Sequence, residues 1–295
     1  MVQSGIQLNL KNQVTDESFQ QGMVEEPILL ITSERSRMAY AIIDRQRQKA
    51  VVLRDYQLIS DPGNDPDYLP GFFTQVLEED ELLKELIPAQ TIFAVYSPEH
   101  SLIPDPLFSK EHIKETLDLT CRLNEDHRYY ADSIRSANAQ MTYAVTKSLL
   151  EETGAHFKEA SLYNAASAFI ESQLRLNKHE SEPIVSVLIR MQELDIVITQ
   201  GNELRFYNSF HFQTSEDFIY FLLFTMEQLQ LNPDQTQVRC YGEIEKISSH
   251  WMLGRKYVRN LYLGEKAEGL NYSYVFDRLS PHQYYGLFSQ YLCVS

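Results

Sequence analysis

The chain has 295 residues and a net charge of −15 at pH 7, from 26 basic and 41 acidic side chains. An acidic chain repels phosphate backbones and anionic lipid headgroups, so this charge argues against nucleic acid and membrane surfaces as partners. Hydrophobic residues make up 43%, enough to bury the core of one large domain or two medium ones. We expect no membrane span, because no apolar run approaches the roughly 20 residues that a spanning helix needs.

The three cysteines, Cys121, Cys240 and Cys293, lie far apart and form no CxxC pair. An odd number excludes a complete disulfide framework, so we expect a reduced, cytoplasmic protein. The first residues carry neither a basic nor an apolar region, and we expect no signal peptide.

The first half of the chain predicts three strands followed by alternating helices and strands. Residues 1–26 are a polar lead-in with one strand at 6–10. Apolar runs predict antiparallel strands at 27–31, 38–44 and 50–58, then a loop at 62–66, a helix at 71–87 and a strand at 91–96. A helix of about 15 residues, capped by Ser109, comes next. The half closes with a strand at 129–145, a helix at 146–152 that Gly154 ends, a brief strand at 157–160 and a helix at 162–176.

The second half repeats this order after a polar stretch at 177–183, where we place a domain boundary. The expected domains are the lead-in 1–26, a first domain 27–180 and a second domain 181–295. Gly201 and Asn202 predict a tight hairpin turn, and Thr214 to Asp217 predicts a helix start of the capping-box type. The other expected elements are strands at 184–191, 194–199, 203–212, 237–241 and 258–263, and helices from 218, at 244–253 and at 280–294.

Two successive β-β-β-α-β-α units indicate an α/β protein with mixed sheets and resemble the actin-like ATPase superfamily, which duplicates a ribonuclease-H-like domain. The chain also resembles an uncharacterised bacterial family, a domain of unknown function assigned to this fold. The resemblance covers residues 27–295 and rests on element order, on the hairpins at 184–210 and on the strand Val238 to Gly242.

The resemblance implies an ATP site with two Asp-x-Gly-x-x-Ser/Thr-like loops and a late glycine pair against the adenosine. The matching first loop carries Thr32, Ser33, Glu34 and Ser36, without Gly or Asp. The second has Arg190 where Gly is expected, followed by Glu193, and the third motif keeps the single glycine Gly242 beside Tyr241. Because larger side chains fill the phosphate space, we expect these to be degenerate nucleotide-site positions, with no cofactor, no metal and no catalytic residue.

Other chemistries have weaker signals. Glu125, Asp126 and His127 could ligate a metal or form a solvated loop, and we favour the loop. The basic cluster at 35–49 fits a solvated sheet face better than a nucleic-acid patch. A ribonuclease-H-like nuclease would need carboxylates on its first strand, and residues 28–31 carry none.

Aromatic residues gather near the C-terminus, and they could form an interaction patch or pack on the second domain, which we favour. They are Tyr272, Tyr274, Phe276, Tyr284, Tyr285, Phe288 and Tyr291. For the whole chain we expect a non-catalytic actin-fold protein that binds another protein as a cytoplasmic scaffold. The resemblance implies this, since degenerate members serve so in secretion and pilus assembly. The alternatives are a divergent nucleotide-dependent ATPase or kinase with a rebuilt site between the halves, and a small-molecule or nucleotide sensor.

Overall fold

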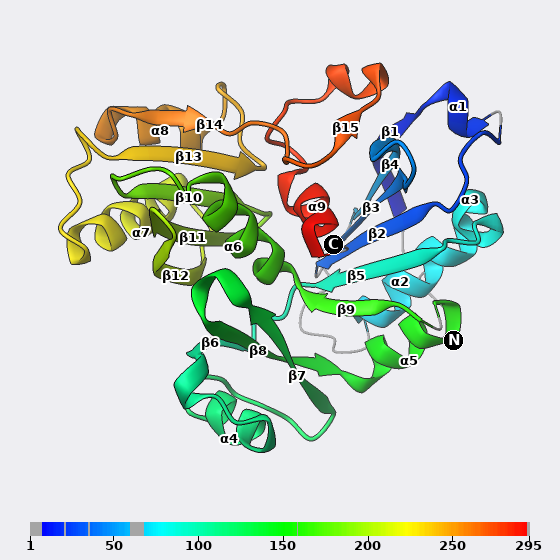
Figure 1. Ribbon diagram of the computed structural model, residues 1–295, viewed down its shortest axis with the longest axis horizontal. Coiled ribbons are helices and arrows are strands. Elements are labelled where there is room, and N and C mark those ends of the chain that lie inside the picture. Colours follow the sequence, from blue (N-terminus) through cyan, green and yellow to red (C-terminus); the bar gives the residue numbers. More distant parts are fainter. Residues whose placement is uncertain (1–7, 21, 35, 60–67, 158, 294–295) are drawn as a thin grey trace.

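The computed structural model describes residues 8–20, 22–34, 36–59, 68–157 and 159–293 (Figure 1). The expected loop at 62–66, the start of the expected strand at 6–10 and Arg35 of the basic cluster lie outside these residues.

The first sheet is mixed, as the sequence predicts. Among the described residues it has seven strands in the order β1-β4-β3-β2-β5-β9, with β15 also paired to β4. Neighbours β2, β3 and β4 are antiparallel, whereas β5 and β9 run parallel to β2. The strands are β1 Leu8–Thr15, β2 Ile28–Glu34, β3 Arg37–Asp44, β4 Lys49–Leu58, β5 Gln90–Val95, β9 Ser161–Asn164 and β15 Asn271–Tyr272.

The second sheet repeats this pattern with five strands in the described part of the chain. Their order is β12-β11-β10-β13-β14, antiparallel across the two hairpins and parallel from β10 onward. Gly201 has φ +56° at the turn between β11 and β12, which explains why glycine stands there. The strands are β10 Ile184–Ile189, β11 Glu193–Gln200, β12 Glu203–His211, β13 Gln237–Gly242 and β14 Leu261–Leu263.

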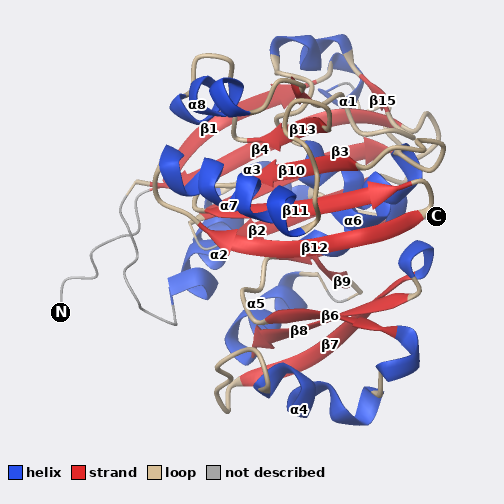
Figure 2. Cartoon of the chain, turned by 90° about the vertical axis from the view of Figure 1, so that its left-hand side faces the viewer, coloured by secondary structure: helices blue, strands red, loops and turns tan. Residues whose placement is uncertain are grey.

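Helices cover both sheets and fill the space between them. Helices α7 and α8 cover one face of the second sheet, and α6 lies against its other face (Figures 1 and 2). The α-helices are α1 Glu17–Gln20, α2 Tyr68–Glu79, α3 Glu81–Glu85, α4 Ile113–Asp118, α5 Lys147–His156, α6 Ala165–Leu176, α7 Ser215–Gln228, α8 Ser249–Tyr257 and α9 Tyr285–Phe288. Short 3₁₀ helices span Asp105–Leu107, Lys110–His112, Arg135–Ala137, Tyr274–Arg278 and Ser289–Cys293.

A small third sheet projects from the main body beside α4 (Figure 2). Its strands are β6 His100–Pro104, β7 His127–Ile134 and β8 Ala139–Thr146. The continuous strand expected at 129–145 is therefore wrong, because the chain reverses through Asn138 at φ +50°. The long helix after Ser109 is also wrong: a 3₁₀ turn and the six-residue α4 replace it, and the Ser109 side chain makes no cap hydrogen bond.

The helix expected at 71–87 breaks into α2 and α3 at the buried Asp80. Its Oδ1 accepts hydrogen bonds from the backbone N–H of Leu82 and Leu83, which caps α3. Its Oδ2 accepts hydrogen bonds from the hydroxyls of Tyr40 and Tyr56, each at 2.7 Å. The break therefore allows Asp80 to connect the start of α3 to strands β3 and β4 of the first sheet.

Several other boundaries shift. Helix α5 continues past Gly154 to His156, and the brief strand expected at 157–160 lies at β9 instead. The Asn164 side chain caps α6, so this helix begins three residues later than expected. The helices expected at 244–253 and 280–294 are wrong in extent, since α8 begins at Ser249 and α9 has four residues before a 3₁₀ turn.

The C-terminal segment returns to the first sheet. Asn271 and Tyr272 pair with Lys49 and Ala50 of β4, and the first core takes in the aromatic side chains Phe276, Tyr284, Tyr285 and Phe288. The expectation that these residues pack on the second domain is therefore incomplete, because several of them belong to the core of the first sheet and Tyr274 is exposed. The domain boundary at 177–183 stays a prediction, although the strands of the first sheet, apart from β15, precede it.

Candidate functional site

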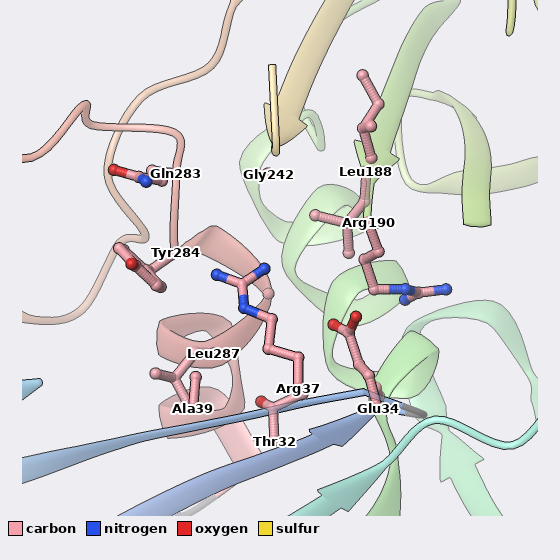
Figure 3. Close-up of a pocket in the computed structure, with 13 residues that line it drawn as sticks. Thr32, Glu34, Arg37, Ala39, Leu188, Arg190, Gly242, Gln283, Tyr284 and Leu287 are labelled. Atoms are coloured by element: carbon pink, nitrogen blue, oxygen red, sulfur yellow. The ribbon is translucent and has the colours of Figure 1, made fainter. Parts of the chain in front are cut away.

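A pocket opens between the two sheets, at the ends of β2, β10 and β13 (Figure 3). The segment around α9 closes one side, and the volume is about 510 Å³ with the mouth included. Open α/β sheets bind ligands at the carboxyl ends of their strands, so this is the natural position for a site. It is lined by Thr32, Glu34, Arg37, Ala39, Ala165, Leu188, Ile189, Arg190, Gly242, Gln283, Tyr284, Gly286 and Leu287.

The pocket brings together four of the seven nucleotide-site positions expected from the sequence, namely Thr32, Glu34, Arg190 and Gly242. Successive residues of β2 face opposite sides of the sheet, so Thr32 and Glu34 reach the pocket whereas Ser33 does not. Ser33 is fully buried, and its hydroxyl has no hydrogen-bond partner.

The two other positions, Ser36 and Glu193, take part in contacts between the halves. Ser36 Oγ lies 3.1 Å from Met191 Sδ, so one hairpin turn touches the other. Glu193 Oε2 accepts a hydrogen bond from the Tyr96 hydroxyl at 3.1 Å, and its Oε1 lies 3.0 Å from His211 Nδ1. The turns that were matched from the sequence to the two phosphate loops therefore contact each other through Ser36 and Met191.

Gly242 is explained by backbone geometry. Its φ is +82°, and a Cβ here would lie 2.1 Å from the carbonyl oxygen of Ile189. Its N–H donates to the His282 carbonyl at 2.9 Å, and the next N–H, of Glu243, donates to the Ile189 carbonyl at 2.8 Å. Neither amide is therefore free for a ligand. Because Gly242 has no side chain, strands β10 and β13 can approach closely.

Arg37, which sequence reasoning missed as a site residue, is the best-paired cation in the pocket. Its Nε and Nη2 donate to the two oxygens of Asp55 at 2.8 and 2.9 Å, and its Nη1 donates to Glu243 Oε1 at 2.5 Å. The Tyr284 hydroxyl also donates to Asp55, at 2.8 Å. Burial opposes the charged form of Arg37, but Asp55 outweighs burial, so the pKa of Arg37 is raised. No sequence signal marks it, because Glu243 lies 206 residues away.

Arg190 is likewise committed to groups of the protein. Its guanidinium lies 4.0 Å above the centre of the Tyr96 ring, and Nη1 forms a 2.5 Å ion pair with the fully buried Asp195. Burial opposes its charge most strongly, but Asp195, Tyr96 and Glu34 together outweigh burial, so the pKa of Arg190 is raised. Arg190 therefore binds the halves together through Tyr96.

Glu34 lies between the two guanidiniums in the view of Figure 3. Burial raises its pKa, and the positive charges of Arg190 and Arg37 only partly oppose this effect. The site and its direct partners thus combine two cations with the carboxyl groups of Glu34, Asp55, Asp195 and Glu243.

These residues do not fit magnesium-bound ATP. A nucleotide site needs backbone amides and cations free to meet phosphate oxygens, together with oxygen ligands for Mg²⁺. Here Arg37 is hydrogen-bonded to Asp55 and Glu243, and the Gly242 amide donates to the His282 carbonyl. Arg190 is ion-paired with Asp195, although its buried guanidinium nitrogens make no hydrogen bond. No group of three or more His, Cys, Asp or Glu side chains within the described ranges could hold a metal ion. In the Glu125 to His127 segment, Asp126 pairs instead with Lys147 at 3.4 Å.

Comparison with known proteins agrees with this architecture. A family model described as protein of unknown function (DUF3822) matches residues 16–261, and no curated protein matches the sequence. A Bacteroides thetaiotaomicron protein of unknown function with an actin-like ATPase fold superposes with a TM-score of 0.74 and 17% identity, over 82% of this chain and 92% of that one. A chain of the PilM-PilN type IV pilus biogenesis complex superposes with a TM-score of 0.56 and 11% identity, over 88% and 97%.

The chain therefore has the actin-like ATPase fold, and the resemblance stated from its sequence is confirmed. Among the helices that the structure describes, none is long and apolar enough to cross a membrane.

Proposed function

Since the chain belongs to the DUF3822 family, whose function is unknown, we propose its function from its own residues. It is a non-catalytic actin-fold protein of the cytoplasm that acts by binding another protein. The observation that carries this proposal is the pairing of both pocket arginines with buried carboxylates.

A phosphate could reach these arginines only by displacing Asp55 or Asp195. Both carboxylates are fully buried, and breaking a buried ion pair costs about 3–5 kcal/mol. Acids also outnumber cations around the pocket, so the local charge disfavours a triphosphate. The fold is therefore retained here without the chemistry of an ATPase.

The partner and the compartment have separate support. A chain of the same fold, at a TM-score of 0.56, is part of the PilM-PilN complex, and we extend protein binding to this chain as a proposal. Cys121 and Cys240 are free thiols, and Cys240 is buried, which suits a reducing compartment.

A divergent nucleotide-binding enzyme is the second candidate, and one observation favours it. The pocket contains Glu34, an acid with a raised pKa, and groups with perturbed pKa values are common at functional sites. Such an enzyme would need a ligand whose contacts replace those of Asp55 and Asp195.

Thermal unfolding with ATP, ADP and Mg²⁺ separates the two candidates. We expect no change in Tm, whereas a ligand present at 100 times its Kd would raise Tm by about 5 °C or more. Glu34→Trp, which fills the pocket, and Gln57→Trp, outside its lining, are the matched variants. A rise in Tm that Glu34→Trp abolishes and Gln57→Trp keeps would overturn the non-catalytic proposal.

Chemical cross-linking in host cells, followed by purification of the full chain, tests the protein-binding part. A specific partner chain that survives stringent washing is the expected result. Recovery of the protein alone, under conditions where a known complex of the same cells is captured, would contradict it.

A further inference from the structure

Four aromatic rings form a connected surface on the second domain, which we call the aromatic face: Phe210 of β12 and Tyr220, Phe221 and Phe224 of α7. The Phe210 and Phe221 rings stack at 4.7 Å between centroids, and Tyr220 and Phe224 stack at 5.9 Å. Tyr220 meets Phe221 edge to face at 5.4 Å, which joins the two pairs.

The helix turns these rings away from the core. Phe218, Leu222 and Met226 of α7 are buried against the second sheet, whereas Tyr220 and Phe224, one turn apart, point outward and are 60% and 42% exposed. Figure 2 shows α7 on the outer side of this sheet. An amphipathic helix ordinarily carries polar residues on its outer face, so these two aromatic residues need an explanation.

Three other strongly exposed apolar side chains in the described part of the chain lie far from one another in the sequence. Ile87, Leu107 and Leu119 are more exposed than Tyr220, but they stand on separate segments, and single exposed apolar residues are common on protein surfaces. Aromatic side chains, by contrast, are enriched at the centres of protein interfaces.

Acidic side chains border the aromatic face at both ends of α7. Glu216 lies one turn before Tyr220, Glu227 lies three residues after Phe224, and both are exposed. The helix has no Lys or Arg from Ser215 to Gln228. The outer stripe of α7 therefore has an acidic group at each end and two aromatic rings in its middle.

We propose that the aromatic face is the docking surface for the protein partner, and that this partner presents an amphipathic helix with Lys or Arg at both ends of an apolar stretch. The proposal rests on the protein-binding function above. Glu216 and Glu227 are 11 residues apart, which is about 16 Å along a helix, so basic residues three turns apart on the partner would meet both. Lys and Arg also bind favourably over exposed aromatic rings.

The acidic charge of α7 favours a basic helix over a second copy of the chain, a lipid surface or a nucleic acid. A second copy of the chain would bring its own acidic α7 and a net charge of −15 against the first. An anionic lipid surface or a nucleic acid would be repelled by Glu216 and Glu227 for the same reason. A basic helix would be attracted by the acidic groups at the ends of the stripe and by the aromatic rings in its middle.

The test is photo-cross-linking of the full-length chain in host cells, with p-benzoylphenylalanine at Tyr220 or, as control, at Tyr274. Tyr274 is 66% exposed and lies in a different segment of the chain. We expect a cross-link from position 220 to a basic amphipathic segment of another protein and none from position 274. Phe224→Ser, and separately Glu216→Lys with Glu227→Lys, should each reduce that cross-link at least tenfold. Glu111→Lys with Glu115→Lys, two exposed acids beside and on α4, should leave it unchanged.

Each failure has its own meaning. A partner that cross-links at position 274 but not at 220, or through an acidic or uncharged segment, overturns the aromatic face and leaves the proposed function standing. A cross-link from position 220 to a second copy or to lipid also overturns it. If chemical cross-linking recovers no partner at all, the proposed function itself fails. Unchanged Tm values for the variants exclude misfolding as the cause.

Discussion

The cleft between the sheets and the outer face of α7 use their side chains in opposite ways. In the cleft, Arg37 and Arg190 are paired with fully buried carboxylates of the protein itself. On α7, Tyr220 and Phe224 contact other aromatic rings but remain largely open to solvent. Groups that already have buried partners stabilise the fold, and groups that remain exposed are available for recognition. This difference is why we propose recognition for the surface of α7 and structural roles for the cleft.

The largest effect should come from removing Arg37. Arg37→Ala leaves Asp55 buried without its cation and should lower the free energy of unfolding by about 3–5 kcal/mol. Urea denaturation measures this difference. The exposed pair of Arg205 and Glu203 supplies the control, where Arg205→Ala should change stability by less than about 1 kcal/mol. Equal effects of the two substitutions would remove the structural role assigned to the cleft.

Gly242→Ala should come next, because two penalties act at one position. A positive φ strains alanine, and its Cβ would meet the carbonyl oxygen of Ile189, so we expect a loss of about 2–3 kcal/mol. Gly22→Ala is the matched control, since Gly22 also has a positive φ but no atom within 4 Å of the added Cβ. Its loss should be about 1 kcal/mol. The same loss at both glycines would show that close packing of β10 and β13 does not require Gly242.

The strands of the two hairpin units could be predicted because local patterns decide them. Apolar runs fix β2, β3 and β10, Gly201 fixes a hairpin turn, and the capping box of Thr214 and Asp217 fixes the start of α7. The degenerate phosphate loops stay a prediction, which rests on the resemblance and on Arg190 standing where glycine was expected.

Features that depend on distant partners could not be predicted. Asp80 ends α2 because it bonds to Tyr40 and Tyr56, and the helical pattern on both sides conceals that break. Arg37 looked like a solvated surface residue until the fold placed it against Asp55 and Glu243. The polar strand β6 has too little apolar alternation to be detected.

A smaller effect should depend on pH at Glu34. Its folded-state pKa is raised, mainly by burial, so the folded protein holds this proton more tightly than the unfolded chain does. Below pH 4.5, the ordinary value, both states are protonated and Glu34 has no destabilising effect. As the pH rises above that value, the unfolded chain ionises first and stability decreases. Glu34→Gln should therefore be more stable than the wild type at pH 7 but not at pH 3, as measured by urea denaturation. A pH-independent gain at position 34 would argue against ionisation as its cause.

The smallest effect on stability should come from the aromatic face. Tyr220→Ser removes a ring that is 60% exposed, so the free energy of unfolding should fall by less than about 1 kcal/mol. Phe218→Ala, on the buried side of the same helix, should lower it by about 3–5 kcal/mol. Urea denaturation of both variants measures the contrast. A decrease in the free energy of unfolding at Tyr220 as large as that at Phe218 would mean that the Tyr220 ring stabilises the fold, and it would contradict a role in partner binding alone. If the small value is observed, and Phe224→Ser reduces the partner cross-link from position 220 without a loss of Tm, stability and recognition are separated within one helix.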